Sequence, residues 1–159
     1  MNSRWLFLLF ALFATPALAE PITLTINEAG AVSQGLAAMA RGEQKVVKDG
    51  EKQTVVTVPA YLSPAVRIAI GKDIARIEVV LKPVREEIAA MVRACGDKCE
   101  GAGKAKLDEQ VAAEGLKTVT MDLVTFTVPE LQLDRNVAIT PDMLRAAGPV
   151  LPFMRETTK

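Results

Sequence analysis

The stretch from Ser63 to Cys95 reads SPAVRIAIGKDIARIEVVLKPVREEIAAMVRAC, and it decides the fold. Ser63 is a favoured N-cap residue, and Pro64 suits the first helical position, where its missing N–H removes no hydrogen bond. Gly96 ends the run. A helix of about 31 residues, roughly 46 Å long, is therefore predicted. Its apolar residues alternate in steps of four and three, the heptad spacing with which helices pack side by side: Ile70, Ile74, Ile77, Leu81, Val84, Ile88, Met91 and Cys95.

Pro83 lies inside this helix and predicts a kink between Val79 and Pro83, because proline removes one backbone hydrogen bond and clashes with the preceding turn. The charged residues of the helix, Asp73 and Arg76 among them, are expected to solvate its remaining faces. A binding face made of these charges is the alternative.

A second, shorter helix is predicted over residues 104–114, where Leu107 and Val111 lie on one side. Together the two helices form an antiparallel hairpin over residues 63–115. The second arm is about a third as long as the first, so it is expected to cover only the stripe from Val84 to Cys95. Ile77 is then buried by the rest of the domain.

The segment before the long helix contains two further predicted elements. Residues 21–26 form a short strand, and Asn27 is the expected N-cap of a helix that ends near Arg41. Gly30 and Gly35 weaken that helix by about 1 kcal/mol each, which indicates close packing against a neighbour.

Residues 44–58 are typical of a β-hairpin, with β-branched runs on either side of Asp49-Gly50, a strong tight-turn signal. The charged margin of this hairpin contains Lys45, Lys48 and Lys52. These lysines form either a basic contact patch or a solvated tip, and the solvated tip is favoured.

After the helical hairpin, residues 116–128 predict a strand. Its apolar phase changes at Leu123-Val124, which indicates a bulge or a strand buried on both sides. Asp122 fits an exposed edge position better than a catalytic one. Residues 129–137 are irregular, and Thr140-Pro141 opens a short helix. The predicted fold is α+β, a long helical hairpin packed on a small antiparallel sheet with flanking short helices.

The first 19 residues have the pattern of a secretory signal peptide: Arg4, an apolar run over 5–14, and the small-residue cleavage site Ala17-Leu18-Ala19. An uncleaved membrane anchor is the alternative, but the run is too short to span about 30 Å of hydrocarbon. The expected mature protein is one domain over residues 20–159. It begins at Glu20 and is periplasmic or secreted, with no stable membrane anchor.

Composition narrows the function. The 159-residue chain has 19 basic and 19 acidic residues and no histidine. Balanced charge gives no field to attract nucleic acid. Histidine is the commonest acid–base residue near neutral pH and the commonest metal ligand. No nucleophile, phosphate-loop or metal motif is present. We therefore expect no catalytic, metal-binding or cofactor-binding residues and no cofactor.

Cys95 and Cys99 are the two cysteines of the chain. A pair four residues apart at a helix end lies within bridging range, and an oxidising compartment favours a disulfide there. Free thiols are the second interpretation. A reactive or metal-binding pair is the third, weakened by C-x-x-x-C spacing and by the absence of histidine.

The order of elements, together with three short motifs, resembles a group of small bacteriophage and prophage proteins of unassigned function. The motifs are Leu81-Lys82-Pro83, Val119-Thr120-Met121-Asp122-Leu123 and Ile139-Thr140-Pro141-Asp142-Met143-Leu144. The resemblance covers most of Asn27 to Leu151 and implies a small α+β protein with no known catalytic residues. The signal peptide and the cysteine pair depart from that group.

The leading functional hypothesis is an exported, non-catalytic interaction or structural protein that binds a protein partner or a second copy of itself. One alternative is a small periplasmic enzyme. The other is a carrier of an apolar ligand, which requires a cavity of about 300 Å³ or more.

Overall fold

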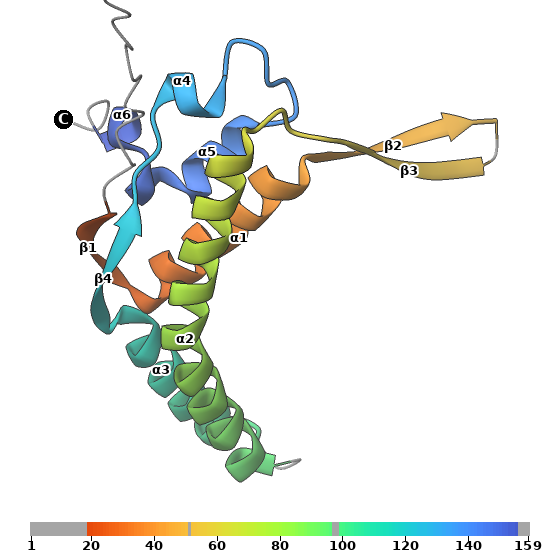
Figure 1. Cartoon of the computed structure of the whole chain (residues 1–159). Coiled ribbons are helices and arrows are strands. Elements are labelled where there is room, and N and C mark those ends of the chain that lie inside the picture. Colours follow the sequence, from red (N-terminus) through yellow and green to blue (C-terminus); the bar gives the residue numbers. More distant parts are fainter. Residues whose placement is uncertain (1–18, 51, 97–98, 156–159) are drawn as a thin grey trace, which may run out of the picture.

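The computed structural model describes residues 19–50, 52–96 and 99–155. Its elements, in chain order, are β1 (Ala19–Thr25), α1 (Ile26–Arg41), β2 (Glu43–Asp49), β3 (Lys52–Val58), α2 (Pro64–Cys95), α3 (Ala102–Leu116), β4 (Thr118–Val124), α4 (Val128–Leu131), α5 (Pro141–Ala146), η2 (Gly148–Val150) and α6 (Pro152–Arg155). Figure 1 shows α2 as the axis of the molecule, with α3 beside its C-terminal half and a β2–β3 hairpin that extends away from the other elements. The predicted α+β class and the long helical hairpin are confirmed.

Helix α2 begins and ends where the sequence predicts. The Ser63 side chain accepts the Val66 N–H, Pro64 is the first helical residue, and the helix continues through Pro83 to Cys95. Ile70 and Ile77 are completely buried, and α1 and β4 pack against this half of the helix. The prediction that Ile77 faces the core is confirmed.

The second arm of the helical hairpin is longer than predicted. Helix α3 has 15 residues against 32 in α2, about half rather than a third. It packs against α2, and the stripe there, including Val84, Ile88 and Met91, is only partly buried.

Strands β1 and β4 pair antiparallel, from Ala19 opposite Val124 to Thr25 opposite Thr118. The predicted strand over 116–128 is too long, because β4 ends at Val124 without a bulge. The change of apolar phase has another cause: the chain leaves the sheet, and Phe126 is buried beyond it, where its N–H donates to the Val150 carbonyl oxygen.

Helix α1 starts two residues earlier than predicted, so Asn27 is not its N-cap. Thr25 caps the helix: its hydroxyl accepts the Glu28 N–H, and the Glu28 carboxylate accepts the Thr25 N–H. This reciprocal pair satisfies two amide groups that the first helical turn leaves unpaired.

Close packing of α1 is confirmed at Gly35, where a Cβ atom would lie 2.8 Å from the Ala147 nitrogen at the end of α5. Gly30 has no such neighbour within 4 Å.

We call β1, α1, β4, residues 64–81 of α2 and the elements from α4 to α6 the head. Its core combines side chains from all of these segments, including Leu36, Ile70, Leu123, Phe126 and Leu151. The C-terminal segment closes the head, and Thr140 caps α5 at the predicted Thr140-Pro141 start. Residues 129–137, predicted as irregular, include most of the short helix α4.

Candidate protein-interaction surface

The β2–β3 hairpin, residues 43–58, is a projecting arm (Figure 1). Val46 and Val55 face each other across one side of the arm, while Val47 and Val56 lie on the opposite side. All four are exposed, at 59%, 61%, 49% and 45% respectively. Neither side of the arm is therefore covered by the head, and apolar surface faces solvent on both.

The root of the arm is held firmly. Gly42 has φ +91°, and a Cβ atom there would lie 2.1 Å from the Val58 carbonyl oxygen, so only glycine fits. Arg67 of α2 ties both ends of the arm to the head by donating to the carbonyl oxygens of Ala40 and Ala60, at 3.5 and 2.6 Å.

A buried asparagine anchors the chain just beyond the arm. Asn136 accepts the Tyr61 N–H at 3.0 Å and donates to the carbonyl oxygens of Tyr61 and Leu131. Because these contacts fix the segment after β3, the direction of the arm is set by the head.

The sequence predicted this hairpin and its strand limits to within a residue, and it placed the lysines on a charged margin. It missed the exposed valines. Val46-Val47 and Val55-Val56 are adjacent pairs, and neighbouring residues in a strand point to opposite faces. Both faces of the arm had to be apolar, and the head can cover at most one.

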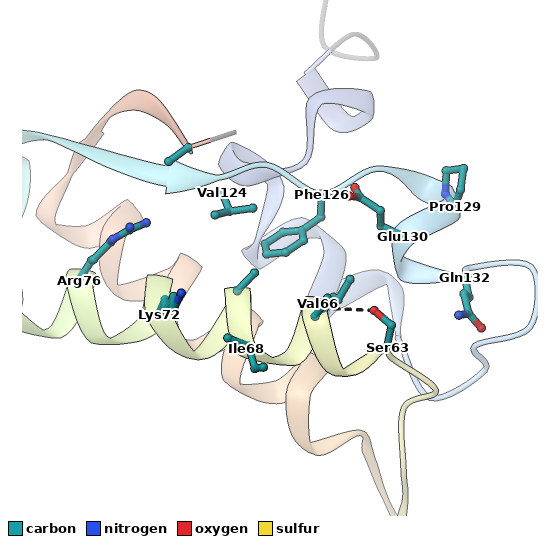
Figure 2. A pocket seen from close by; sticks show the side chains of 13 residues that line it. Ser63, Val66, Ile68, Lys72, Arg76, Val124, Phe126, Pro129, Glu130 and Gln132 are labelled. Atoms are coloured by element: carbon teal, nitrogen blue, oxygen red, sulfur yellow. Dashed lines mark hydrogen bonds between the residues drawn. The ribbon is translucent and has the colours of Figure 1, made fainter. Parts of the chain in front are cut away.

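A groove of about 810 Å³ lies between the N-terminal half of α2 and the chain after β4. Figure 2 shows Phe126 directed toward α2, with Lys72 and Arg76 on successive turns of that helix. Val66, Ala69, Val124 and Phe126 contribute apolar lining. The groove exceeds the size required of a ligand carrier, and its charged end is cationic.

Beside the groove, Asp73 and Arg76 bind the edge of β4 that β1 leaves open. Asp73 Oδ2 accepts the Val124 N–H at 2.9 Å, and Arg76 Nη1 donates to Asp73 Oδ1 at 3.1 Å and to the Asp122 carbonyl oxygen at 3.0 Å. These bonds replace those of a third strand, so they fasten the sheet to α2.

The prediction that Asp73 is solvated is wrong, because its side chain is completely buried. Burial raises the pKa of the Asp73 carboxyl above its ordinary value of 3.8, and the Val124 N–H and Arg76 partly oppose that rise. Every oxygen of this carboxylate has a partner, so a structural role accounts for the charge.

Cys95 and Cys99 form a disulfide where the helical hairpin turns, with Cα atoms 5.1 Å apart. The predicted pairing is confirmed in the structure. A disulfide is compatible with an oxidising compartment. The predicted signal peptide lies outside the described residues except for Ala19, the first residue of β1.

The described residues contain no group of three or more cysteine, aspartate or glutamate side chains placed to hold a metal ion. Asp122 is exposed on β4, as predicted, and its backbone rather than its carboxylate contacts Arg76. No helix within the described ranges is long and apolar enough to cross a membrane.

No protein-family model, curated protein or solved structure matches this chain. The resemblance to small phage and prophage proteins therefore stays a prediction.

Proposed function

We propose that this chain is an exported, non-catalytic protein-interaction module and that the arm is its binding element. The observation that carries the proposal is the exposure of apolar side chains on both faces of a two-stranded hairpin. Such a hairpin is marginally stable in water by itself, and three or more strands or a packed face are needed for independent stability. A partner that covers the arm supplies what the head does not.

The anchoring of the root supports the same proposal. An arm that only carried solvated charge would need no fixed direction. Here Gly42, Arg67 and Asn136 fix both connections to the head, so the valines are presented in one orientation, and less conformational entropy is lost when a partner binds.

Export rests on the predicted signal peptide and is supported by the disulfide. The intact mass of the protein recovered from a producing cell's envelope should correspond to a chain that begins at Glu20. Retention of Met1 or recovery in the membrane pellet would contradict export with cleavage.

The test of the binding proposal compares two tagged chains in the cells that produce the protein. One is the full chain, and the other replaces residues 43–58 with two glycines. After brief cross-linking, the full chain should retain a specific protein partner, another chain or a second copy of itself, and the arm-deleted chain should not. Equal recovery of the partner by both chains would overturn the proposal.

A second candidate function is the binding of an anionic amphiphile in the groove. The apolar walls and the cations Lys72 and Arg76 fit a molecule with an acidic head and a hydrocarbon tail. Lys72 has no ion-pair partner in the described part of the chain. Dodecanoate should then bind to the native chain and more weakly to Lys72→Glu, while Lys82→Glu, outside the groove, serves as the control. Equal binding to all three would exclude the groove.

A further inference from the structure

The two edges of the arm differ in their hydrogen-bonding groups and charges. The register closes the hairpin with Asp49 opposite Lys52 and leaves two residues between the strands. In such hairpins the closing pair is hydrogen-bonded, and bonded and non-bonded pairs then alternate. Val55 opposite Val46 is consequently a non-bonded pair. The N–H and C=O groups of Gln53, Val55 and Thr57 therefore point to the open edge of β3.

The corresponding open edge of β2 is protected by charge. Its outward-pointing residues are Gln44, Val46 and Lys48, and Lys45 lies between them. Lysine on an edge strand opposes pairing with another chain, because a partner strand would have to cover its charge. Strand β3 has no charged residue from Gln53 to Val58, so the arm has one protected edge and one unprotected edge.

The unprotected edge is complementary to itself. If two β3 strands meet antiparallel about a two-fold axis at Val55, each Val55 faces the Val55 of the second copy. Gln53 then faces Thr57, and Thr54 faces Val56. Every pair has matching side-chain faces, the outward N–H and C=O groups meet in hydrogen-bonded pairs, and no charge lies opposite its own copy from Gln53 to Thr57.

We propose that the occupant of this edge is a second copy of the chain, paired through β3 about Val55. This inference rests on the proposed function, and it names the partner and the contact. Pairing turns two exposed hairpins into one four-stranded sheet in the order β2–β3–β3–β2. The valines at 46 and 55 of both copies form a continuous row on one face, and only the lysine-bearing β2 edges stay open.

The contact is small, since it involves only one short strand from each copy. Interfaces well below about 1,200 Å² are characteristic of weak or transient complexes. Association should therefore depend on concentration, and a covalent trap is the appropriate assay.

Two single cysteine variants of the full chain provide the trap. Val55→Cys and Val46→Cys start from almost equal exposure, 61% and 59%, and lie side by side on the same face. In the proposed sheet the two copies of position 55 are adjacent. The two copies of position 46 are three strand spacings apart, about 14 Å, which exceeds the reach of a disulfide of about 7 Å between Cα atoms.

Under mild oxidation V55C should form a covalent dimer and V46C should not, with unchanged far-ultraviolet circular dichroism in both. Dimer formation by V46C instead, by both variants equally, or by neither would overturn the second-copy inference.

A charge variant tests the same pairing without a new thiol. Val55→Lys places two lysines directly opposite each other and should abolish the concentration-dependent dimer in light scattering. Val46→Lys, which has no like charge opposite it, should retain the dimer. Loss of the dimer in both variants or in neither would contradict pairing about Val55.

The failures of the two proposals are distinguishable. If V55C forms no dimer while the full chain, but not the arm-deleted chain, still retains another protein, the partner is a different chain and only the second-copy inference fails. If the arm-deleted chain retains its partner as well as the full chain does, the proposed function fails.

Discussion

Replacement of residues 43–58 by two glycines should leave the head folded and nearly as stable as in the full chain. The design is feasible because the root is narrow: a Cβ atom on Gly42 would lie 2.9 Å from the Cα atom of Pro59. The four exposed valines contact one another rather than the head, so their removal opens no core cavity.

The magnitude follows from two opposing changes. Val58 is half-buried against the core, and losing its contact costs roughly 1 kcal/mol, about half the value of a fully buried valine. Shortening the connection from 16 residues to two is three halvings, each worth about 0.6 kcal/mol in loop-closure entropy in the opposite direction. The free energy of unfolding should therefore change by less than about 1 kcal/mol.

Urea unfolding followed by circular dichroism measures this difference, since α1 and α2 dominate the signal. A loss of more than about 2 kcal/mol would show that the arm stabilises the head, and the exposed valines would then not be free for a partner. Gly42 and Arg67 are unchanged in this design, so the result reports on the arm itself.

Three further predictions concern the head and the helical hairpin. Ile77→Ala should destabilise the protein by about 2–5 kcal/mol because Ile77 is fully buried, while Val79→Ala, at a position that is 74% exposed, should cost less than about 0.5 kcal/mol; equal urea midpoints would contradict this core assignment. Burial raises the folded-state pKa of Asp73, so its stability contribution is full below pH 3.8 and falls as pH rises through the folded pKa; the stability of the native chain minus that of Asp73→Asn should fall from roughly pH 4 to pH 7, and a rise would refute the direction. Thiol labelling of denatured, non-reduced protein should find neither Cys95 nor Cys99 free, whereas two labelled thiols per chain would disprove the disulfide.

Local signals predicted much of the fold. The Ser63-Pro64 and Thr140-Pro141 helix starts are correct because each depends on a side-chain cap within three residues. The Asp49-Gly50 hairpin is also correct, since its turn chemistry is local. The true cap of α1 was legible as well, because Thr25 and Glu28 have the capping-box spacing.

The burial of Asp73 depended on a contact between segments far apart in the chain. Asp73 lies three residues after Ile70 and four before Ile77, which places it on the buried face of α2. Its role required knowing that the open edge of β4, some fifty residues later, lies against that face. The groove likewise depends on where the chain after β4 runs, which residue spacing does not reveal.

The exposed arm was hidden for a different reason. β-branched runs predict strands, but they do not say how many strands pair or what covers them. Adjacent valines indicate two apolar faces, and only the fold shows that the head covers neither.

The most direct test of the arm as a binding element is site-specific photo-cross-linking in the cells that produce the protein. A photoreactive residue at position 55 is compared with one at Val137, a more exposed valine, at 75%, in a loop of the head. Position 55 should give a discrete covalent adduct, with a second copy or with another protein, and position 137 should give none. No adduct at position 55, or the same adducts at both positions, would contradict the arm as the site of interaction.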